Sequence, residues 1–192
     1  MTENPGQRFM SAAAREDWPV AEAALRDLLK SAPDNPSLHY NLALVLRRQG
    51  RAESALEAVR ACLVLSAAHQ GARFEKAACL MDLGYLREAE AAFTAYLDTF
   101  PDDPGARGCR ARLRLRLGEP QKALEDCEKA LKGNPELSLS RAEALGDLGR
   151  VEEAEAILFP FYRSASRLRP AILKIIGQGP DGGMPFDTGV SG

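Results

Sequence analysis

A glycine that returns at a fixed interval constrains the fold of this chain more than any other feature. An interval of 34 residues separates Gly50, Gly84 and Gly118. A second set of small residues keeps the same interval, at Ala55, Ala89 and Ala123. Proline closes three of the resulting repeat units, at Pro33, Pro101 and Pro135. Self-similarity at a period of this size is typical of stacked helical repeats, so we predict an all-α fold.

Each repeat unit is predicted to contain two helices, an A helix before the recurring glycine and a B helix after it. In the second unit, the A helix is expected over 37–49 and the B helix over 52–65, because apolar residues recur there at helical spacing. Gly50 is expected to end the A helix in the left-handed conformation. Small Ala55 is expected where the two helices approach closely, and a larger side chain there should cost roughly 1–3 kcal/mol.

Five such units are expected over residues 2–168, and two of their features are irregular. The predicted units lie near 2–35, 36–69, 70–103, 104–137 and 138–168. Because Pro135 lies three residues closer to the next glycine than Pro101 does, the fifth A helix, near 137–147, is predicted to be shortened. Pro160 is expected to kink or split the last B helix. Residues 169–176 are predicted to cap the array and 177–192 to form a flexible Gly/Pro-rich tail.

The repeat resembles the tetratricopeptide repeat (TPR) family. The resemblance rests on the 34-residue period, the recurring glycine, alanine and proline, and a small residue at the eighth position of three units (Ala43, Ala77 and Ala111). It implies a right-handed superhelical solenoid of about five antiparallel helix-turn-helix repeats, whose concave groove is lined by the A helices. Basic residues depart from the family pattern in the fourth A helix, at Arg107, Arg110 and Arg114. Their stems are expected to cover apolar surface while their charged ends stay in water, in a less regular helix.

The same resemblance implies which side chains line the groove. These residues are Tyr40, Leu44, Arg47, Arg48, Phe74, Met81, Arg112, Leu115 and Arg116. Tyrosine and arginine are typical of binding hot spots, and arginine suits carboxylates. One interpretation is a groove for a peptide or partner segment with an acidic element. The alternative is that the arginines only solvate the helices and pair with nearby Glu or Asp.

Composition argues against several other functions. The net charge of −2 does not favour nucleic-acid binding, and no apolar run is long enough to span a membrane. The start of the chain lacks the layout of a signal peptide, so a cytoplasmic location is expected. The four cysteines form no CxxC motif and are expected to be small packing residues. Two histidines are too few for most histidine-based metal sites, so no metal is expected.

Catalytic motifs are also weak in this chain. Gly177, Gly179 and Gly182 have the spacing of a dinucleotide fingerprint, but Pro180 sits in the turn and no helix can follow, so no cofactor is expected. We therefore predict a non-enzymatic scaffold or adaptor that binds a protein or peptide partner. The alternative is a regulatory or substrate-recruiting TPR module of a larger enzyme. Self-association through the tail or the end repeats is left open.

Overall fold

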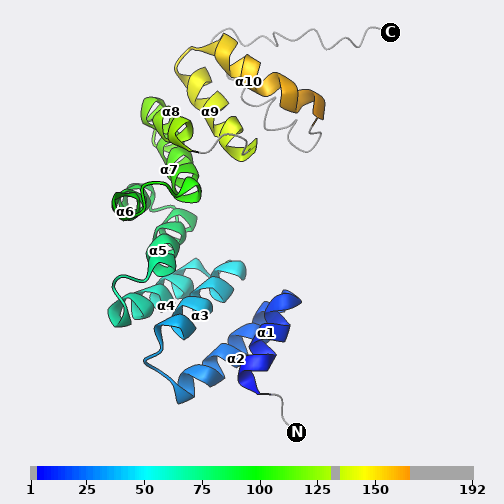
Figure 1. Cartoon of the computed structure of the whole chain (residues 1–192), viewed down its shortest axis with the longest axis vertical. Coiled ribbons are helices and arrows are strands. Elements are labelled where there is room, and N and C mark those ends of the chain that lie inside the picture. The colour runs from blue at the N-terminus through cyan, green and yellow to red at the C-terminus, as the bar shows by residue number, and fades with distance from the viewer. Residues whose placement is uncertain (1–3, 131–134, 165–192) are drawn as a thin grey trace. The chain divides into compact units, whose positions relative to one another are not determined.

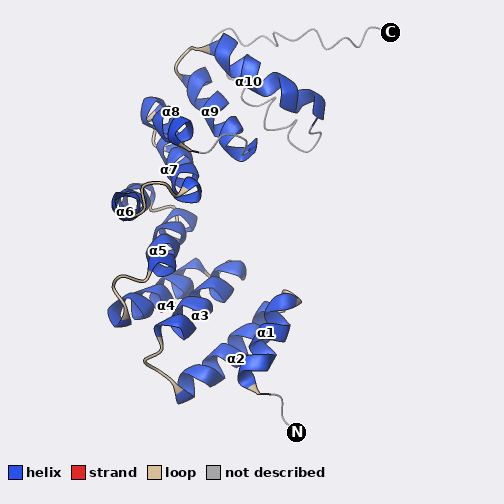
Figure 2. Cartoon of the chain, viewed as in Figure 1, coloured by secondary structure: helices blue, strands red, loops and turns tan. Residues whose placement is uncertain are grey.

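The computed structural model describes residues 4–130 and 135–164, and these residues form ten α-helices without a β-strand (Figures 1 and 2). The helices are α1 (Pro5–Ala14), α2 (Trp18–Ser31), α3 (Pro36–Arg48), α4 (Ala52–Leu65), α5 (Gln70–Asp82), α6 (Leu86–Thr99), α7 (Pro104–Arg116), α8 (Pro120–Lys129), α9 (Pro135–Asp147) and α10 (Val151–Ser164). The predicted all-α helical repeat is confirmed. The predicted capping segment and tail, 169–176 and 177–192, lie outside the described residues.

The chain divides into two compact lobes. The N-terminal lobe comprises residues 1–96 and the C-terminal lobe residues 97–192. In the N-terminal lobe, α3 contacts both its hairpin partner α4 and the next A helix, α5. In the C-terminal lobe, α7 likewise contacts α8 and α9. Each lobe therefore holds two A helices side by side, α3 with α5 and α7 with α9.

The recurring glycine performs the predicted role at the end of each regular A helix. Gly50, Gly84, Gly118 and Gly149 have φ angles of 74°, 80°, 71° and 74°. This left-handed region is strained for residues that carry a Cβ atom. A Cβ added at any of the four would meet nothing within 4 Å. The requirement for glycine is therefore conformational rather than steric.

A side-chain cap at the start of the A helices also follows the 34-residue period and was not predicted. Asn35 Oδ1 accepts a hydrogen bond from the amide of Ser37 at 3.0 Å. His69 Nδ1 accepts one from Ala72 at 3.1 Å, and Asp103 Oδ1 accepts one from Ala106 at 2.9 Å. Each cap satisfies an amide that the first helical turn leaves without a backbone partner. The signal was present in the sequence as acceptor side chains at 35, 69 and 103.

The predicted shortening of the fifth A helix is wrong, because the missing residues belong to the helix before it. Pro135 begins α9, as Pro36 begins α3 and Pro104 begins α7, and all three helices have 13 residues. The shorter helix is α8, with 10 residues against 14 in α4 and in α6. Ala130 ends α8 in an extended conformation (φ −79°, ψ 157°). The fifth pair of helices thus starts at Pro135 rather than at 138.

The last B helix is not split at Pro160. Helix α10 runs from Val151 to Ser164 with Pro160 inside it. Proline removes one amide donor from the helix interior. The helix continues on both sides of Pro160, so the loss of one donor does not end it.

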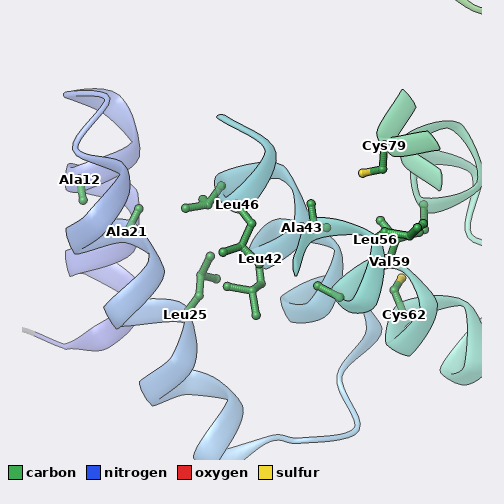
Figure 3. Close-up of a cluster of buried hydrophobic side chains, with 14 residues drawn as sticks. Ala12, Ala21, Leu25, Leu42, Ala43, Leu46, Leu56, Val59, Cys62 and Cys79 are labelled. Carbon is green, nitrogen blue, oxygen red and sulfur yellow. The ribbon is translucent and has the colours of Figure 1, made fainter. Parts of the chain in front are cut away.

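Small and branched apolar residues fill the core of each lobe. In the N-terminal lobe, Ala21 and Leu25 of α2 and Ala55 and Val59 of α4 belong to one buried cluster (Figure 3). Ala55 has no exposed surface, as expected for a close approach between helices. In the C-terminal lobe, Ala111, Ala123, Leu124, Leu145 and Leu158 form the corresponding cluster.

All four cysteines are buried with free thiols, which confirms their predicted role as packing residues. Burial raises the pKa of Cys79 to about 12, and the nearby charge of Glu75 adds to the effect. Burial likewise raises the pKa of Cys127 to about 11, together with the charge of Asp126. Because the thiolate is the reactive form, these two cysteines are suited to packing rather than to chemistry.

Candidate partner-binding faces

The side chains predicted to bind a partner fall on two faces, one in each lobe. The α3–α5 face consists of Tyr40, Leu44, Arg47, Arg48, Phe74 and Met81. The α7 face consists of Arg112, Leu115 and Arg116. Contact between α3 and α5 brings the first set together on two neighbouring helices. The second set lies within about one turn of a single helix.

Tyr40 has a packing role that accounts for its position. Its ring lies 4.7 Å from the ring of His69, centroid to centroid. A Cβ atom at Gly71 would come within 2.7 Å of Tyr40 Cζ, so only glycine fits beneath the ring. Burial and the charge of Glu75 raise the pKa of the Tyr40 hydroxyl. Tyr40 therefore fixes α3 against the start of α5.

Phe74 likewise packs against the B helix of its own repeat. Its ring meets Phe93 edge-on at 5.4 Å and Tyr96 edge-on at 5.7 Å. The Tyr96 hydroxyl is in turn held by Gln70 Nε2 at 3.1 Å. Aromatic pairs in this geometry stabilise a fold beyond the area that they bury. Among the apolar and aromatic members of the α3–α5 face, Leu44 and Met81 therefore have the least evident structural role.

Arg47 is paired within the fold, as the alternative interpretation of the arginines expects. Its Nε donates to Asp82 Oδ2 at 2.7 Å and its Nη1 to Glu75 Oε2 at 3.2 Å. Both carboxylates belong to α5, so the pairing joins the two A helices. Arg48 is exposed, and both arginines lie in the last turn of α3, where positive charge complements the helix dipole.

The positive charge of the α7 face is more accessible than that of the α3–α5 face. Arg112 and Arg116 are exposed, and they lie one turn apart on α7. The Arg112 guanidinium has a contact of 3.4 Å with Cys109 Sγ. Leu115 between them packs against the core of the C-terminal lobe. Two arginines flanking a half-buried leucine suit a partner segment that carries carboxylates.

The other arginines of α7 do not keep their charged ends in water, so that prediction is wrong. The side chains of Arg107, Arg110 and Arg114 are only 14%, 12% and 13% exposed. They converge on Asp126 of α8, whose side chain is 2% exposed. Arg114 Nη1 lies 2.9 Å from Asp126 Oδ2, and Arg107 Nη1 lies 3.7 Å from Asp126 Oδ1. Helix α7 is as long as α3 and α5, so the buried charges do not make it irregular.

The sequence contained a signal for this cluster. Asp126 occupies a position that alanine holds in the three preceding repeats, at Ala24, Ala58 and Ala92, each 34 residues apart. A carboxylate at a small buried position requires a positive partner, because an isolated buried charge is costly. The three arginines supply that partner, so they are not available to a ligand.

Residues 4–130 and 135–164 contain no group of three or more His, Cys, Asp or Glu side chains that could hold a metal ion. In the part of the chain that the structure describes, no helix has the length and apolar character needed to cross a membrane.

The helix pairs and their period define a helical repeat protein, and comparison identifies the family. The sequence profile of the tetratricopeptide repeat family matches residues 7–72, 74–137 and 110–159. The chain belongs to the tetratricopeptide repeat family. Its fold is that of a module for protein–protein interaction, and proteins of this family are typically non-catalytic scaffolds.

Protein FlbA of Caulobacter vibrioides is similar in sequence to this chain. The two are 35% identical over 134 residues, which are 63% of this chain and 21% of FlbA. The chain thus spans about a fifth of the length of this relative. The similarity accordingly concerns one portion of FlbA.

Solved structures of tetratricopeptide repeat proteins share the fold. A TPR protein from Parabacteroides merdae is 22% identical and superposes with a TM-score of 0.78, covering 92% of this chain and 73% of its own. PilF of Pseudomonas aeruginosa is 18% identical and superposes with a TM-score of 0.74, covering 90% of this chain and 82% of the PilF chain. MamA of Desulfovibrio magneticus RS-1 is 16% identical and superposes with a TM-score of 0.76, covering 86% of this chain and 99% of the MamA chain. At these identities the likeness concerns the fold alone.

Proposed function

We propose that this chain is a non-catalytic scaffold or adaptor that binds a segment of a partner protein on its A-helix faces. The observation that carries the proposal is the pair Leu44 and Met81. Both are half-buried on adjacent A helices, and both lie outside the core cluster formed by the described residues of the N-terminal lobe. Aliphatic side chains that are neither fully solvated nor part of the core are suited to a partner's apolar anchor.

The α7 face supplies the charged part of the proposed interaction. Exposed Arg112 and Arg116 are of a residue type that is enriched in binding hot spots. Guanidinium groups are suited to binding carboxylates. The sequence suggested an acidic element from arginines on both α3 and α7, and we now assign that element of the partner to α7 alone.

Quantitative affinity purification with matched variants tests the proposal. Leu44→Glu alters the α3–α5 face, and Arg112→Glu with Arg116→Glu alters the α7 face. Arg60→Glu is the control, because Arg60 is an exposed residue of the B helix α4 in the N-terminal lobe. Each variant is compared with the wild-type chain after its unfolding curve is shown to be unchanged.

The expected result is a loss of the same partner proteins from both face variants and their retention by the control. Truncating or reversing a hot spot costs about 1–2 kcal/mol or more, so the bound fraction should fall roughly tenfold. If Arg60→Glu loses the partners while both face variants keep them, the A-helix faces are not the binding surface.

A further inference from the structure

Two carboxylates of α5 hold Arg47 on the α3–α5 face. Glu75 and Asp82 are seven residues apart on α5, so they lie on the same side of that helix. The side chains of Arg47, Glu75 and Asp82 are 31%, 9% and 37% exposed. The arginine is thus partly accessible, with one buried and one accessible carboxylate beside it.

The net charge of Arg47 and its two carboxylate partners disfavours the binding of an acidic ligand. One guanidinium faces two carboxylates, which leaves a net charge of −1 for Arg47, Glu75 and Asp82. Arg48, whose charge also acts on Glu75, brings the sum to zero. A carboxylate approaching Arg47 would meet both resident carboxylates at short range, and like charges repel. The two arginines of α3 therefore do not make this face positive.

Arg47 retains hydrogen-bonding capacity for a neutral group. A guanidinium has five N–H donors, and the contacts with Glu75 and Asp82 use Nη1 and Nε. Nη2 makes no hydrogen bond to the described residues. Its donors suit an uncharged oxygen, such as a main-chain carbonyl or a side-chain amide. Leu44 precedes Arg47 by about one turn on the same side of α3, and Met81 lies next to Asp82 in the last turn of α5.

We propose that the α3–α5 face binds an uncharged partner segment, with an apolar side chain against Leu44 and Met81 and a neutral carbonyl oxygen at Nη2 of Arg47. Glu75 and Asp82 exclude segments that place a carboxylate there. This rests on the proposed function, in which the A-helix faces bind partner segments. The two lobes then bind different parts of a partner. The α3–α5 face binds an uncharged segment, and an acidic element is assigned to α7 alone.

Selection from a displayed library of random dodecapeptides tests the charge preference on the full chain. The wild type is compared with Asp82→Asn, which removes one accessible charge at nearly constant shape, and with Glu75→Gln. Glu57→Gln, at an exposed position of α4, is the charge-matched control. Arg47→Gln identifies the peptides that depend on this face. Thermal unfolding of each variant verifies that it folds.

Peptides that require Arg47 should be apolar and free of Asp and Glu enrichment on the wild type and on the control. On Asp82→Asn, acidic peptides should appear, with an affinity about two- to fivefold higher than on the wild type. Glu75→Gln is expected to give the same direction of change. Arg47-dependent peptides that are already acid-rich on the wild type, or that ignore both substitutions, would overturn the inference.

The outcomes also separate the inference from the proposed function. If peptides are selected but depend only on Arg112 and Arg116, the α3–α5 assignment is wrong while peptide binding by the chain stands. If no peptide is enriched on any variant, the proposed binding of partner segments fails, and the inference fails with it.

Discussion

Arg110 of α7 holds Asp126 of α8 through two parallel hydrogen bonds inside the C-terminal lobe. Arg110 Nε lies 2.9 Å from Oδ2 and Nη2 lies 2.6 Å from Oδ1. Arg107 and Arg114 approach the same carboxylate. A buried ion cluster adds little stability over well-packed apolar residues, but removing one member leaves uncompensated charge. The pairing of α7 with α8 therefore depends on Asp126.

Replacing Asp126 should destabilise the C-terminal lobe more than any surface substitution. We expect Asp126→Asn to lower the free energy of unfolding by about 3–5 kcal/mol, because three arginines lose their shared counter-charge. Amide hydrogen exchange should rise in α7 and α8 and stay unchanged in α2 to α4. Asp102→Asn, in the exposed turn before α7, is the control and should have little effect. A loss below about 1 kcal/mol for Asp126→Asn would show that the cluster is dispensable.

Gly71 and Tyr40 form a steric pair whose two members should not be independent. Gly71→Ala places a methyl group 2.7 Å from the Tyr40 ring and should cost about 1–3 kcal/mol. In a Tyr40→Ala background the same substitution should cost much less, because the obstructing ring is gone. Chemical denaturation of both single variants and the double variant gives the coupling. Additive effects would contradict the close approach.

His69 should act as a helix cap that other acceptor side chains can replace. His69→Ala removes the acceptor of the Ala72 amide and should lower stability by about 1 kcal/mol. His69→Asn supplies the side chain that caps α3 at Asn35, so it should recover most of the loss. Thermal unfolding of both variants measures the difference. Equal losses in both would assign the effect to the Tyr40 ring contact instead.

Glu75 and Glu22 should contribute to stability with opposite dependence on pH. Burial raises the pKa of Glu75 even though Arg47 opposes it through its charge and hydrogen bond. Its contribution is therefore complete below the pKa of the unfolded chain and is lost as pH rises through the folded value. The wild type should become less stable relative to Glu75→Gln as pH increases across that range.

Glu22 behaves in the reverse sense. Burial alone would raise its pKa, but hydrogen bonds from Arg26 and Gln49 and the charge of Arg51 lower it overall. Its contribution is present above the unfolded pKa and is lost as pH falls through the lowered folded value. Denaturation of the wild type, Glu22→Gln and Glu75→Gln between about pH 3 and pH 7 compares the two slopes. Slopes of the same sign would refute the assignment of one of the two environments.

The regular repeats were predictable because local signals agree with one another there. Helix α4 has the expected bounds of 52–65, since an apolar stripe and a preceding left-handed glycine mark the same start. Pro135 was misassigned because a proline can follow a helix or occupy the first turn of the next one. Both readings fit a unit that lacks three residues. Only the observed end of α8 at Lys129 decides between them.

The side-chain pairings were less predictable, because they join helices that are separate in sequence. Arg47 lies 28 and 35 residues from its two carboxylate partners. The 34-residue period shows which residues occupy equivalent positions in successive repeats. It does not show which side chains contact one another. Asp126 breaks a run of alanines, and that exception was the one local sign of a buried ion cluster.

Site-specific photocrosslinking in cells tests most directly whether the A helices bind a partner. A photoreactive residue is placed at Leu44, at Arg116 or, as the control, at exposed Arg60 of the B helix α4. We expect crosslinks to one partner protein from Leu44 and Arg116 and none to that protein from Arg60. Crosslinks to a partner from Arg60 alone, with none from either A helix, would contradict the account.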